Sequence, residues 1–399
     1  MVTLALAPIA FVPYAGDDTI NRGWARLSWG GAIDEGLAQI HAWMTIQGRF
    51  FPGSVFYTVP MWRIFDSRIS YALWLIILNL TILALVAFVC LRLTRSRDVA
   101  LVGLATTAAC MQIRWWPADG LTGFGGLVPW TLLLTLGTAI GMAHVLQGGD
   151  RRWMIPVSLA WIFAITGYEV SLLMLPGILV CLALAFPARP RSRWLWAAGP
   201  VIVLAGVQLL VSVVLRLQAA GLAPAYETNL GGPVGETFGK QFLAALPSAQ
   251  HWLGGVPAEG TVVTTATALI LLAFAVPTLL AWRWRQPFVP ADVSLRRSAS
   301  LIVVGAWAWV VPSALAAITV RWQEELQLGQ GYIYLVYEYV GIALLLAGVA
   351  SLLARPARPR WATLALALVF TLAIVGLAVT VASNIRFAGQ FVPGPDGGS

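Results

Sequence analysis

The chain has 399 residues, of which 59% are hydrophobic and only 11% are charged, and its mean hydropathy is +0.80. This composition excludes a water-soluble globular protein, because too few polar residues are present to cover its surface. The formal net charge of +8 comes from arginines dispersed over many loops, which gives no support to nucleic-acid binding, since that requires basic residues clustered on one face.

Apolar runs of about the length of a membrane span recur along the chain. A span needs roughly 20 mostly apolar residues to cross roughly 30 Å of hydrocarbon. We therefore expect one all-α transmembrane helical bundle over residues 1–386, followed by a Gly/Pro-rich disordered tail over residues 387–399. The first run is short and lacks a positive flank, so a truncated start and an uncleaved anchor both stay open. The expected spans, about 11 in number, lie near residues 1–14, 69–91, 99–113, 127–147, 154–168, 170–187, 195–216, 263–282, 299–319, 335–353 and 361–385.

The loop charges predict an orientation, because Lys and Arg near span ends are retained on the cytoplasmic side. If Met1 is cytoplasmic, the inner loops hold fifteen arginines and three acidic residues, whereas the remaining loops are net acidic. This partition indicates a multi-pass protein of the inner or plasma membrane. The expected outer loops are residues 15–68, 217–262 and 320–334, joined by short outer turns.

The first outer loop begins with an acidic pair directly after an apolar run. Asp17 and Asp18 are followed closely by Asn21 and Arg22. Adjacent carboxylates at a membrane surface repel one another and lose solvation, so they are costly unless something binds there. We therefore expect a functional site here, with Asn21 and Arg22 among its lining residues.

The same loop continues with a helical pattern and a second polar stretch. Residues 36–44 carry apolar side chains at helical spacing, which predicts a helix along the membrane surface. Arg49 follows, just before the next apolar run. Its planar and permanently charged guanidinium is suited to a phosphate. The tryptophans of this loop are typical of an interfacial aromatic belt, with sugar stacking as the alternative.

Two short outer turns carry further polar residues. The first holds Trp115, Trp116 and Asp119, which we expect to form a wall of a pocket, with an aromatic belt and a simple turn as the alternative. The second is a tight turn between two apolar runs and holds Glu169. A lone acid in this position is costly unless it faces a cavity or a cation.

The later outer loops supply candidate phosphate contacts. Lys240 is the chain's single lysine, and we expect it either to pair with a phosphate or to lie on a solvated face. Residues 242–247 are expected to form a second surface helix. Arg321 offers a charged fork for a lipid-linked phosphate, and Tyr332 begins a run of tyrosines that would line the same site.

Metal ligands are sparse. The cysteines lie in or beside predicted spans and the histidines are scattered, so no zinc site or metal cluster is predicted. Acidic groups at an outer surface can still bind a divalent ion such as Mg²⁺ or Mn²⁺ through oxygen ligands. The residues concerned are Cys90, Cys110, Cys181, His41, His144 and His251.

On these features the chain resembles the GT-C superfamily of integral-membrane glycosyltransferases. The resemblance rests on an apolar first span followed by Gly16-Asp17-Asp18, a long first outer loop with surface helices, arginine-rich inner loops and about 11 spans. The stretches Gln47-Gly48-Arg49-Phe50-Phe51 and Tyr332 to Tyr339 are similar to uncharacterised bacterial members. In architecture the resemblance covers nearly the whole chain.

The resemblance implies a polyprenyl-phosphate sugar donor, a glycan or lipid-linked acceptor, and inverting transfer on the outer face of the membrane. It implies that Asp17 or Asp18 is the general base. Attack by a sugar hydroxyl needs such a base, and the departing phosphate needs cations as its negative charge grows. We therefore expect Glu169 to be a second acid that orients the acceptor or a metal ion, and Arg49 and Arg321 to bind the donor phosphate.

Two other classes of function stay open. A flippase for lipid-linked saccharides would explain the many spans, but it predicts polar groups along a path through the membrane. A non-catalytic assembly partner would use the acidic loop to bind a neighbouring protein. Replacing Asp17 and Asp18 distinguishes these possibilities. Loss of sugar transfer with normal complex assembly favours the enzyme, and loss of assembly alone favours the assembly partner.

Overall fold

The computed structural model describes residues 2–14, 17–114, 119–223, 227–254, 294–353 and 360–390. These residues form helices and connecting loops without any β-strand, which confirms the all-α class. Six of the helices are long and apolar enough to cross a membrane, so the chain has the character of a multi-pass membrane protein. They are α5 (Arg68–Thr94), α7 with its preceding turn (Phe124–Gln147), α10 (Arg191–Gln218), α14 (Leu295–Ala317), α16 (Leu335–Leu353) and, over Ala367–Gly389, most of α17 (Arg360–Gly389).

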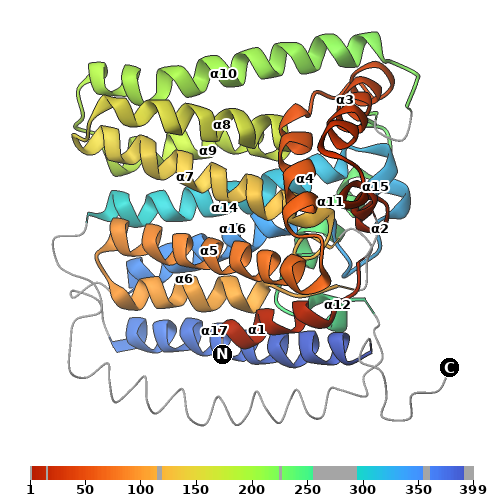
Figure 1. Ribbon diagram of the computed structural model, residues 1–399. Coiled ribbons are helices and arrows are strands. Elements are labelled where there is room, and N and C mark those ends of the chain that lie inside the picture. The colour runs from red at the N-terminus through yellow and green to blue at the C-terminus, as the bar shows by residue number, and fades with distance from the viewer. Residues whose placement is uncertain are drawn as a thin grey trace.

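Three shorter helices lie beside these six in the same bundle (Figure 1). They are α6 (Arg97–Cys110), α8 (Met154–Gly167) and α9 (Glu169–Ala185). At 14 residues, α6 and α8 are each about 21 Å long, which is shorter than roughly 30 Å of hydrocarbon. The runs predicted as spans near 99–113 and 154–168 therefore contain shorter helices than expected. Each ends where the backbone leaves the helical region, at Met111 and at Tyr168.

The two ends of the chain differ from the sequence-based boundaries. The run at 1–14 forms two short pieces, α1 (Val2–Leu6) and the 3-10 helix η1 (Ala7–Phe11), which is followed by extended backbone at Val12. The predicted span near 263–282 lies outside the described residues. The predicted tail starts too early at 387, because α17 continues to Gly389 and buries Ala388.

Helix α16 lies at the centre of the bundle and is its most buried span. Its closest neighbour is α14, and glycines allow the two backbones to approach. A Cβ at Gly341 would lie 2.6 Å from the backbone nitrogen of Trp309, and one at Gly348 would lie 2.7 Å from the side chain of Ile302. Small residues at such contacts are how membrane helices gain van der Waals packing where lipid supplies no hydrophobic driving force.

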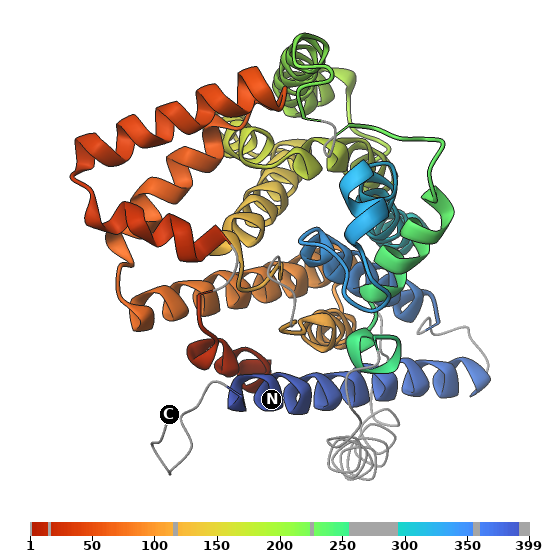
Figure 2. The ribbon, with the colours of Figure 1, turned by 90° about the vertical axis from the view of Figure 1, so that its right-hand side faces the viewer.

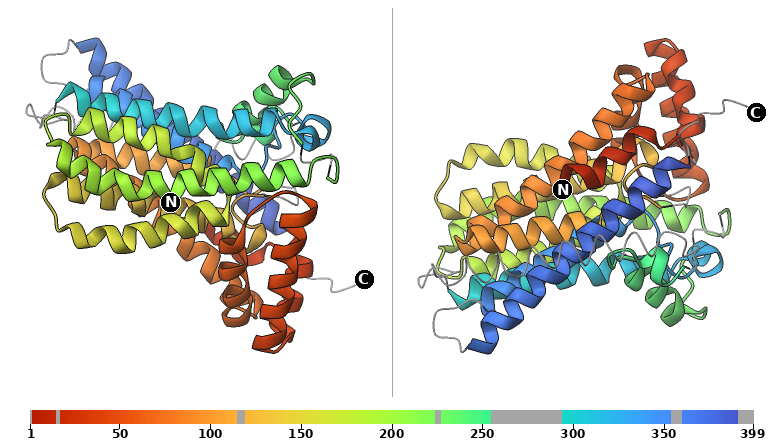
Figure 3. Two further views of the ribbon diagram at one scale, coloured as in Figure 1. Left: turned by 90° about the horizontal axis from the view of Figure 1, so that it is seen from above. Right: turned by 90° about the horizontal axis from the view of Figure 1, so that it is seen from below.

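Short helices cover one end of the bundle, at the right of Figure 1. They are α2 (Asp17–Asn21), η2 (Arg22–Arg26), α3 (Trp29–Ile46), α4 (Pro52–Ile64), α11 (Val234–Ala244), α12 (Ala249–Trp252) and α15 (Val320–Glu325). Figures 2 and 3 show α3 and α4 running across the bundle rather than along it. The helix expected over 36–44 is thus part of α3. The one expected over 242–247 was placed too late, because α11 begins eight residues earlier and ends at Ala244, so residues 245–247 lie beyond it.

The two ends of the bundle differ in their charged residues. The junctions α5–α6, α7–α8 and α9–α10 and the start of α14 lie together at the left of Figure 1. These junctions are rich in arginine, with Arg92, Arg95, Arg97, Arg151, Arg152, Arg189, Arg191, Arg193, Arg296 and Arg297 among the described residues. The covered end holds most of the described acidic residues. The fold therefore has one basic end and one acidic end.

Candidate functional site

A cavity of about 290 Å³ lies at the acidic end, where the short helices meet the bundle. Its wall combines aromatic rings, amides and two arginines from segments far apart in the sequence. Of the residues predicted to form the site, Asn21, Arg49, Arg321 and Tyr332 line it. The described lining also includes Trp24, Gln39, Trp43, Gln47, Phe51, Ser54, Val55, Thr58, Phe124, Leu127, Gly167 and Tyr168.

Arg49 enters the wall because the chain turns sharply after α3. Gly48 has φ +62°, and a Cβ there would lie 2.7 Å from the Cα of Arg216, so the turn needs glycine. The backbone N–H of Arg49 then donates to the carbonyl of Trp43 at 3.0 Å. Its guanidinium lies over the ring of Phe51, 4.4 Å from the centroid, an arrangement that is favourable for a cation.

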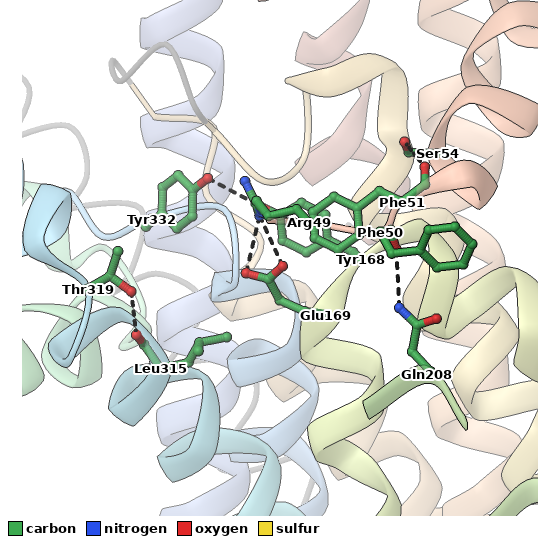
Figure 4. A network of polar contacts seen from close by, with 10 residues as sticks. All are labelled: Arg49, Phe50, Phe51, Ser54, Tyr168, Glu169, Gln208, Leu315, Thr319 and Tyr332. Carbon is green, nitrogen blue, oxygen red and sulfur yellow. Dashed lines mark hydrogen bonds and ion pairs between the residues drawn. The ribbon is translucent and has the colours of Figure 1, made fainter. Parts of the chain in front are cut away.

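The guanidinium of Arg49 is paired with the carboxylate of Glu169. Arg49 Nη2 donates to both carboxylate oxygens, at 3.1 and 3.0 Å (Figure 4). Glu169 is the first residue of α9, where the helix dipole favours a negative charge. Burial lowers the pKa of Arg49, but Glu169 and nearby tyrosines raise it, and the net pKa lies above the ordinary arginine value. The guanidinium of Arg49 therefore keeps its charge, and both side chains of the pair are mostly shielded from solvent.

Tyrosines complete this part of the wall. The hydroxyls of Tyr168 and Tyr332 lie 3.0 Å apart, and the ring of Tyr168 stacks on Phe51 with centroids 5.9 Å apart. Burial raises the pKa of Tyr168 to about 12, so its hydroxyl is neutral at physiological pH. Tyr332 is fixed by its backbone N–H, which donates to Gln241 at 2.7 Å. Arg49 and Tyr332 also line a smaller cavity of about 40 Å³ behind the wall, together with Glu169.

Arg321 reaches the main cavity from α15. Its Nε donates to both oxygens of Glu325, at 3.1 and 3.0 Å, and its guanidinium lies 4.9 Å from the ring centroid of Trp322. Both side chains of the ion pair are about 40% exposed, so the pair contributes little to stability. The partial exposure of Arg321 fits a cation that can change partners.

Asp18 lies outside the described lining of this cavity. It is fully buried, and the hydroxyl of Tyr71 donates to its Oδ2 at 2.5 Å. The same hydroxyl is 2.8 Å from the carbonyl oxygen of Thr122. Asp18 thus ties α2 to α5 and to the loop before α7. Asn21, three residues later in the same short helix, does line the cavity.

Asp119 and Arg22 take part in local contacts near Asp18. Asp119 is 3% exposed, and its Oδ2 accepts from the N–H and hydroxyl of Thr122 at 3.1 and 2.8 Å. Burial raises the pKa of Asp119 to about 6, against the lowering effect of Thr122. Arg22 stacks on Tyr14, 4.9 Å from its centroid. Neither residue lines the cavity.

Three predicted site residues are only partly described or lie outside the described residues. The backbone of Asp17 begins α2, but its side chain is outside the description, as are Trp115 and Trp116 altogether. Lys240 is described and lies apart from the cavity lining. Its Nζ is 2.8 Å from Glu236, one turn earlier in α11, and Glu236 is 65% exposed. The side chain of Lys240 is itself only 24% exposed, so it is partly buried beside an exposed acid and is not on an open solvated face.

Two buried charged residues were not among the predicted site residues. Arg114 is 3% exposed and donates to the carbonyls of Ala244, Gly329 and Gln330, which fixes the loop before Tyr332. Glu338 is fully buried in α16. The one available signal was Glu338 itself, a carboxylate within an apolar run, whereas the partners of Arg114 are backbone atoms that no sequence pattern marks.

Glu338 belongs to a polar cluster inside the bundle. Its Oε1 accepts from Gln241 and from Ser313, each at 3.0 Å. Near it, the hydroxyl of Tyr337 lies 2.7 Å from Ser171 and 3.2 Å from Thr131. Polar groups therefore continue from the tyrosine wall into the helices α7, α9, α14 and α16.

Within the described ranges, no group of three or more His, Cys, Asp or Glu is placed to hold a metal ion. Comparisons of the chain with family models, curated proteins and solved structures gave no match. The geometry of the cavity is therefore the basis for a functional assignment.

Proposed function

We propose that this chain is a membrane glycosyltransferase of the GT-C type. It moves a hexosyl or pentosyl group, with inversion, from a polyprenyl-phosphate-linked donor to a cell-envelope glycan or lipid-linked acceptor. The single observation that carries the proposal is the cavity at the acidic end, which combines Arg49 and Arg321 with aromatic rings and amides. A lipid-linked phosphosugar presents the complementary groups, namely an anion, a polar ring and a hydrocarbon chain.

The two arginines match the needs of the departing phosphate. Negative charge grows on the leaving group as the anomeric bond breaks, and cations fixed in advance stabilise it most strongly where water is excluded. Arg49 is fixed by Glu169 and by stacking on Phe51. Arg321 has exposed surroundings and a weak partner. We propose that Arg49 contacts the donor phosphate during the reaction, whereas Arg321 binds the donor as it enters the cavity.

The aromatic wall matches the sugar. Trp24, Trp43 and Tyr168 line the cavity beside the amides of Gln39 and Gln47. Ligand sites of this kind combine apolar surface with a few placed polar groups that fix orientation. A pyranose presents apolar C–H faces and a rim of hydroxyls, so it satisfies both kinds of surface.

Of the two candidate bases, we propose Asp17. Asp18 is already engaged with Tyr71 inside the fold. Glu169 is engaged with Arg49, so we assign it to positioning Arg49 rather than to a metal or the acceptor. A Mg²⁺ or Mn²⁺ ion is not part of the proposed mechanism.

The proposed topology places this cavity on the non-cytoplasmic side, with the arginine-rich end in the cytoplasm as the positive-inside rule requires. Six helices are long enough to span the membrane. We propose that α6, α8 and α9 cross it as well, since they run beside the six (Figure 1). With the predicted run at 263–282, this arrangement would give ten spans, one fewer than the predicted count, because the first run forms two pieces of five residues each.

A second candidate is a flippase or other transporter of lipid-linked saccharides. The polar cluster of Glu338, Gln241 and Ser313, with Tyr337 beside it, favours this candidate because buried polar groups in membrane helices mark transport paths. Glu338 Oε1 holds α11 against α14 and α16, whereas its buried Oε2 has no hydrogen-bond partner within the described residues, so a structural role accounts for one of its two oxygens. The cavity, by contrast, has an opening and two arginines.

The test is transfer of a labelled sugar from a polyprenyl-phosphate donor by the purified chain in nanodiscs, with cell-envelope extract as acceptor. The parent should release free polyprenyl phosphate, whereas Asp17→Asn should lower the rate by at least about 100-fold and still bind donor. Asp18→Asn is measured in parallel, because Asp18 is the other candidate base. Donor binding without release by every form, together with movement of the donor between leaflets, would establish the transporter instead. Loss of binding to a co-purifying protein alone would indicate an assembly partner.

A further inference from the structure

A second large cavity lies at the opposite, arginine-rich end of the bundle. Its volume is about 600 Å³. It is bounded by the last turn of α5, the last residue of α7, the loop after α9 and the first turn of α14. The described residues that line it include no Asp or Glu. They are Phe88, Leu91, Arg92, Leu93, Arg95, Gln147, Phe186, Arg189 and Arg297.

Four arginines thus converge on one cavity from three separate parts of the chain. Arg92 Nη2 donates to the neutral amide oxygen of Gln147 at 2.8 Å, a bond that holds the guanidinium at the junction of α5 and α7. Arg95 ends α5 in the left-handed region, at φ +52°, a conformation that normally favours glycine. A backbone conformation of this kind is a recognised mark of functional positions.

The arginines repel one another, and this repulsion is strongest where water is partly excluded. The carbonyl ends of α5 and α7 offset some of it, as does the acid Asp98, which lies three residues after Arg95 in the first turn of α6. An anion within the cavity would offset more of it, and the planar guanidinium forks are well suited to phosphate oxygens. The chemistry of this cavity therefore points to a phosphate group.

An apolar cavity of about 150 Å³ adjoins the basic one. The two share Phe88, Arg92, Leu93, Gln147 and Phe186 as lining residues. From there the apolar cavity continues between α5, α7 and α9, along Val89, Ala139, Ile140, Ala143 and Leu182. A free phosphate or a nucleotide would use only the basic cavity, whereas an amphiphile with a phosphate headgroup and a hydrocarbon chain would fill both.

We infer that the arginine-rich end holds an anionic phospholipid. Its headgroup phosphate lies among Arg92, Arg95, Arg189 and Arg297, and one acyl chain lies in the groove between α5, α7 and α9. Basic pockets between the ends of membrane helices are typical headgroup sites, and this site lies at the level where helix ends meet the headgroups. It is separate from the cavity proposed for sugar transfer and does not depend on that proposal.

The test measures lipid binding to the purified full-length chain by native mass spectrometry after delipidation. Phosphatidylglycerol is the anionic probe, and phosphatidylcholine and inorganic phosphate are the comparisons. The double variant Arg92→Gln/Arg297→Gln should weaken phosphatidylglycerol binding about 30-fold, since each arginine near an anionic headgroup contributes roughly fivefold. Arg152→Gln is the matched control, because Arg152 is an exposed arginine of the same end that does not line the cavity.

A second variant tests the acyl chain independently of charge. Ala143→Trp adds bulk to the apolar cavity and should weaken phosphatidylglycerol binding while leaving all four arginines in place. Equal binding of phosphatidylglycerol and phosphatidylcholine, or equal losses in the Arg92/Arg297 variant and the Arg152 control, would overturn the inference. Tight binding of inorganic phosphate that is lost in the arginine variant and unchanged in Ala143→Trp would show a site for a free anion instead. A thermal-unfolding scan of each variant confirms that it is folded.

Discussion

Arg49 and Glu169 form a bidentate ion pair across 120 residues of sequence, and this pair joins the end of α3 to the start of α9. Together with the bond from Gln208 to the carbonyl of Phe50, it links the layer of short helices to the membrane bundle on this side of the cavity. Arg49 lines the main cavity and Glu169 lies behind it. Glu169 therefore fixes the position of the Arg49 guanidinium in the cavity wall. Both residues can therefore be tested for stability and for function separately.

For stability, we expect Glu169→Gln to lower the free energy of unfolding by roughly 2–3 kcal/mol. Removing one partner of a buried ion pair costs about 3–5 kcal/mol, and the 15% and 22% exposure of these side chains reduces that figure. The double variant Arg49→Gln/Glu169→Gln should lose less than the sum of the single variants, because it leaves no unpaired charge. Denaturant unfolding in detergent measures all three. Strictly additive losses would contradict a direct interaction.

Asp119 predicts a pH dependence of stability. Burial raises its pKa from 3.8 in the unfolded chain to about 6 in the fold. An acid with a raised pKa stabilises the fold while it is protonated, so its contribution is full below about pH 4 and is lost as pH rises through about 6. The loss is at most about 3 kcal/mol.

The measurement is the unfolding temperature in detergent between pH 4 and 7, for the parent and for Asp119→Asn. The parent should lose more stability than the variant as pH rises through this window, since Asn does not titrate. The rest of the chain titrates equally in both proteins, so only the difference between the two curves is informative. Parallel curves would show that Asp119 has an ordinary pKa.

The sequence predicts which single charged residues belong to the site, but not which of them pair. Arg49 and Glu169 were both identifiable, because each is a charge beside an apolar run. Their partnership was not, because nothing in the sequence brings residue 49 near residue 169. Trp43 illustrates the opposite difficulty. Its interfacial position was expected, but only the path of α3 across the bundle shows that it lines a cavity.

The helices were predictable where apolar runs are long and uninterrupted, as in α5, α10 and α16. Sequence reasoning was weaker where backbone geometry ends a helix inside an apolar run. Met111 and Tyr168 are apolar or aromatic, so hydropathy continues past them, whereas the helices α6 and α8 do not. Glu338 was also visible as an acid entering a span, but its pairing with Gln241 depends on the folding back of α11.

The Asp18–Tyr71 hydrogen bond should be a measurable part of the fold. Tyr71→Phe removes a bond between a hydroxyl and a buried carboxylate, which typically contributes about 1.5–3 kcal/mol. Tyr14→Phe is the matched control, because the ring of Tyr14 contacts that of Tyr71 at a tilt of 54° with centroids 5.0 Å apart, and its hydroxyl makes no hydrogen bond within the described ranges. Thermal unfolding should show a clear loss for Tyr71→Phe alone. Equal effects of the two substitutions would contradict the assigned bond.

The close approach of α14 and α16 predicts a strong position effect for glycine. Gly341→Ala places a methyl group 2.6 Å from the backbone of Trp309, and overpacking of this kind costs about 1–3 kcal/mol. Gly206→Ala, in α10, meets nothing within 4 Å and should be neutral or stabilising by up to about 1 kcal/mol, because alanine is the better helix former. Comparable effects at the two positions would show that the α14–α16 contact is looser than described.

The last prediction separates the two roles proposed around Arg49. If Arg49 stabilises the departing phosphate, Arg49→Gln should lower the turnover number about 100-fold or more, because loss of one fixed transition-state contact has that effect on other acyl- and phosphoryl-transfer sites. Glu169→Gln keeps the guanidinium but releases it, so its turnover should fall less and its KM for donor should change more. Lys240→Gln is the charge-matched control, since Lys240 pairs with Glu236 away from the cavity. It should transfer sugar at the parent rate. An equal loss in Arg49→Gln and Lys240→Gln would mean that net positive charge, and not the position of Arg49, supports the reaction.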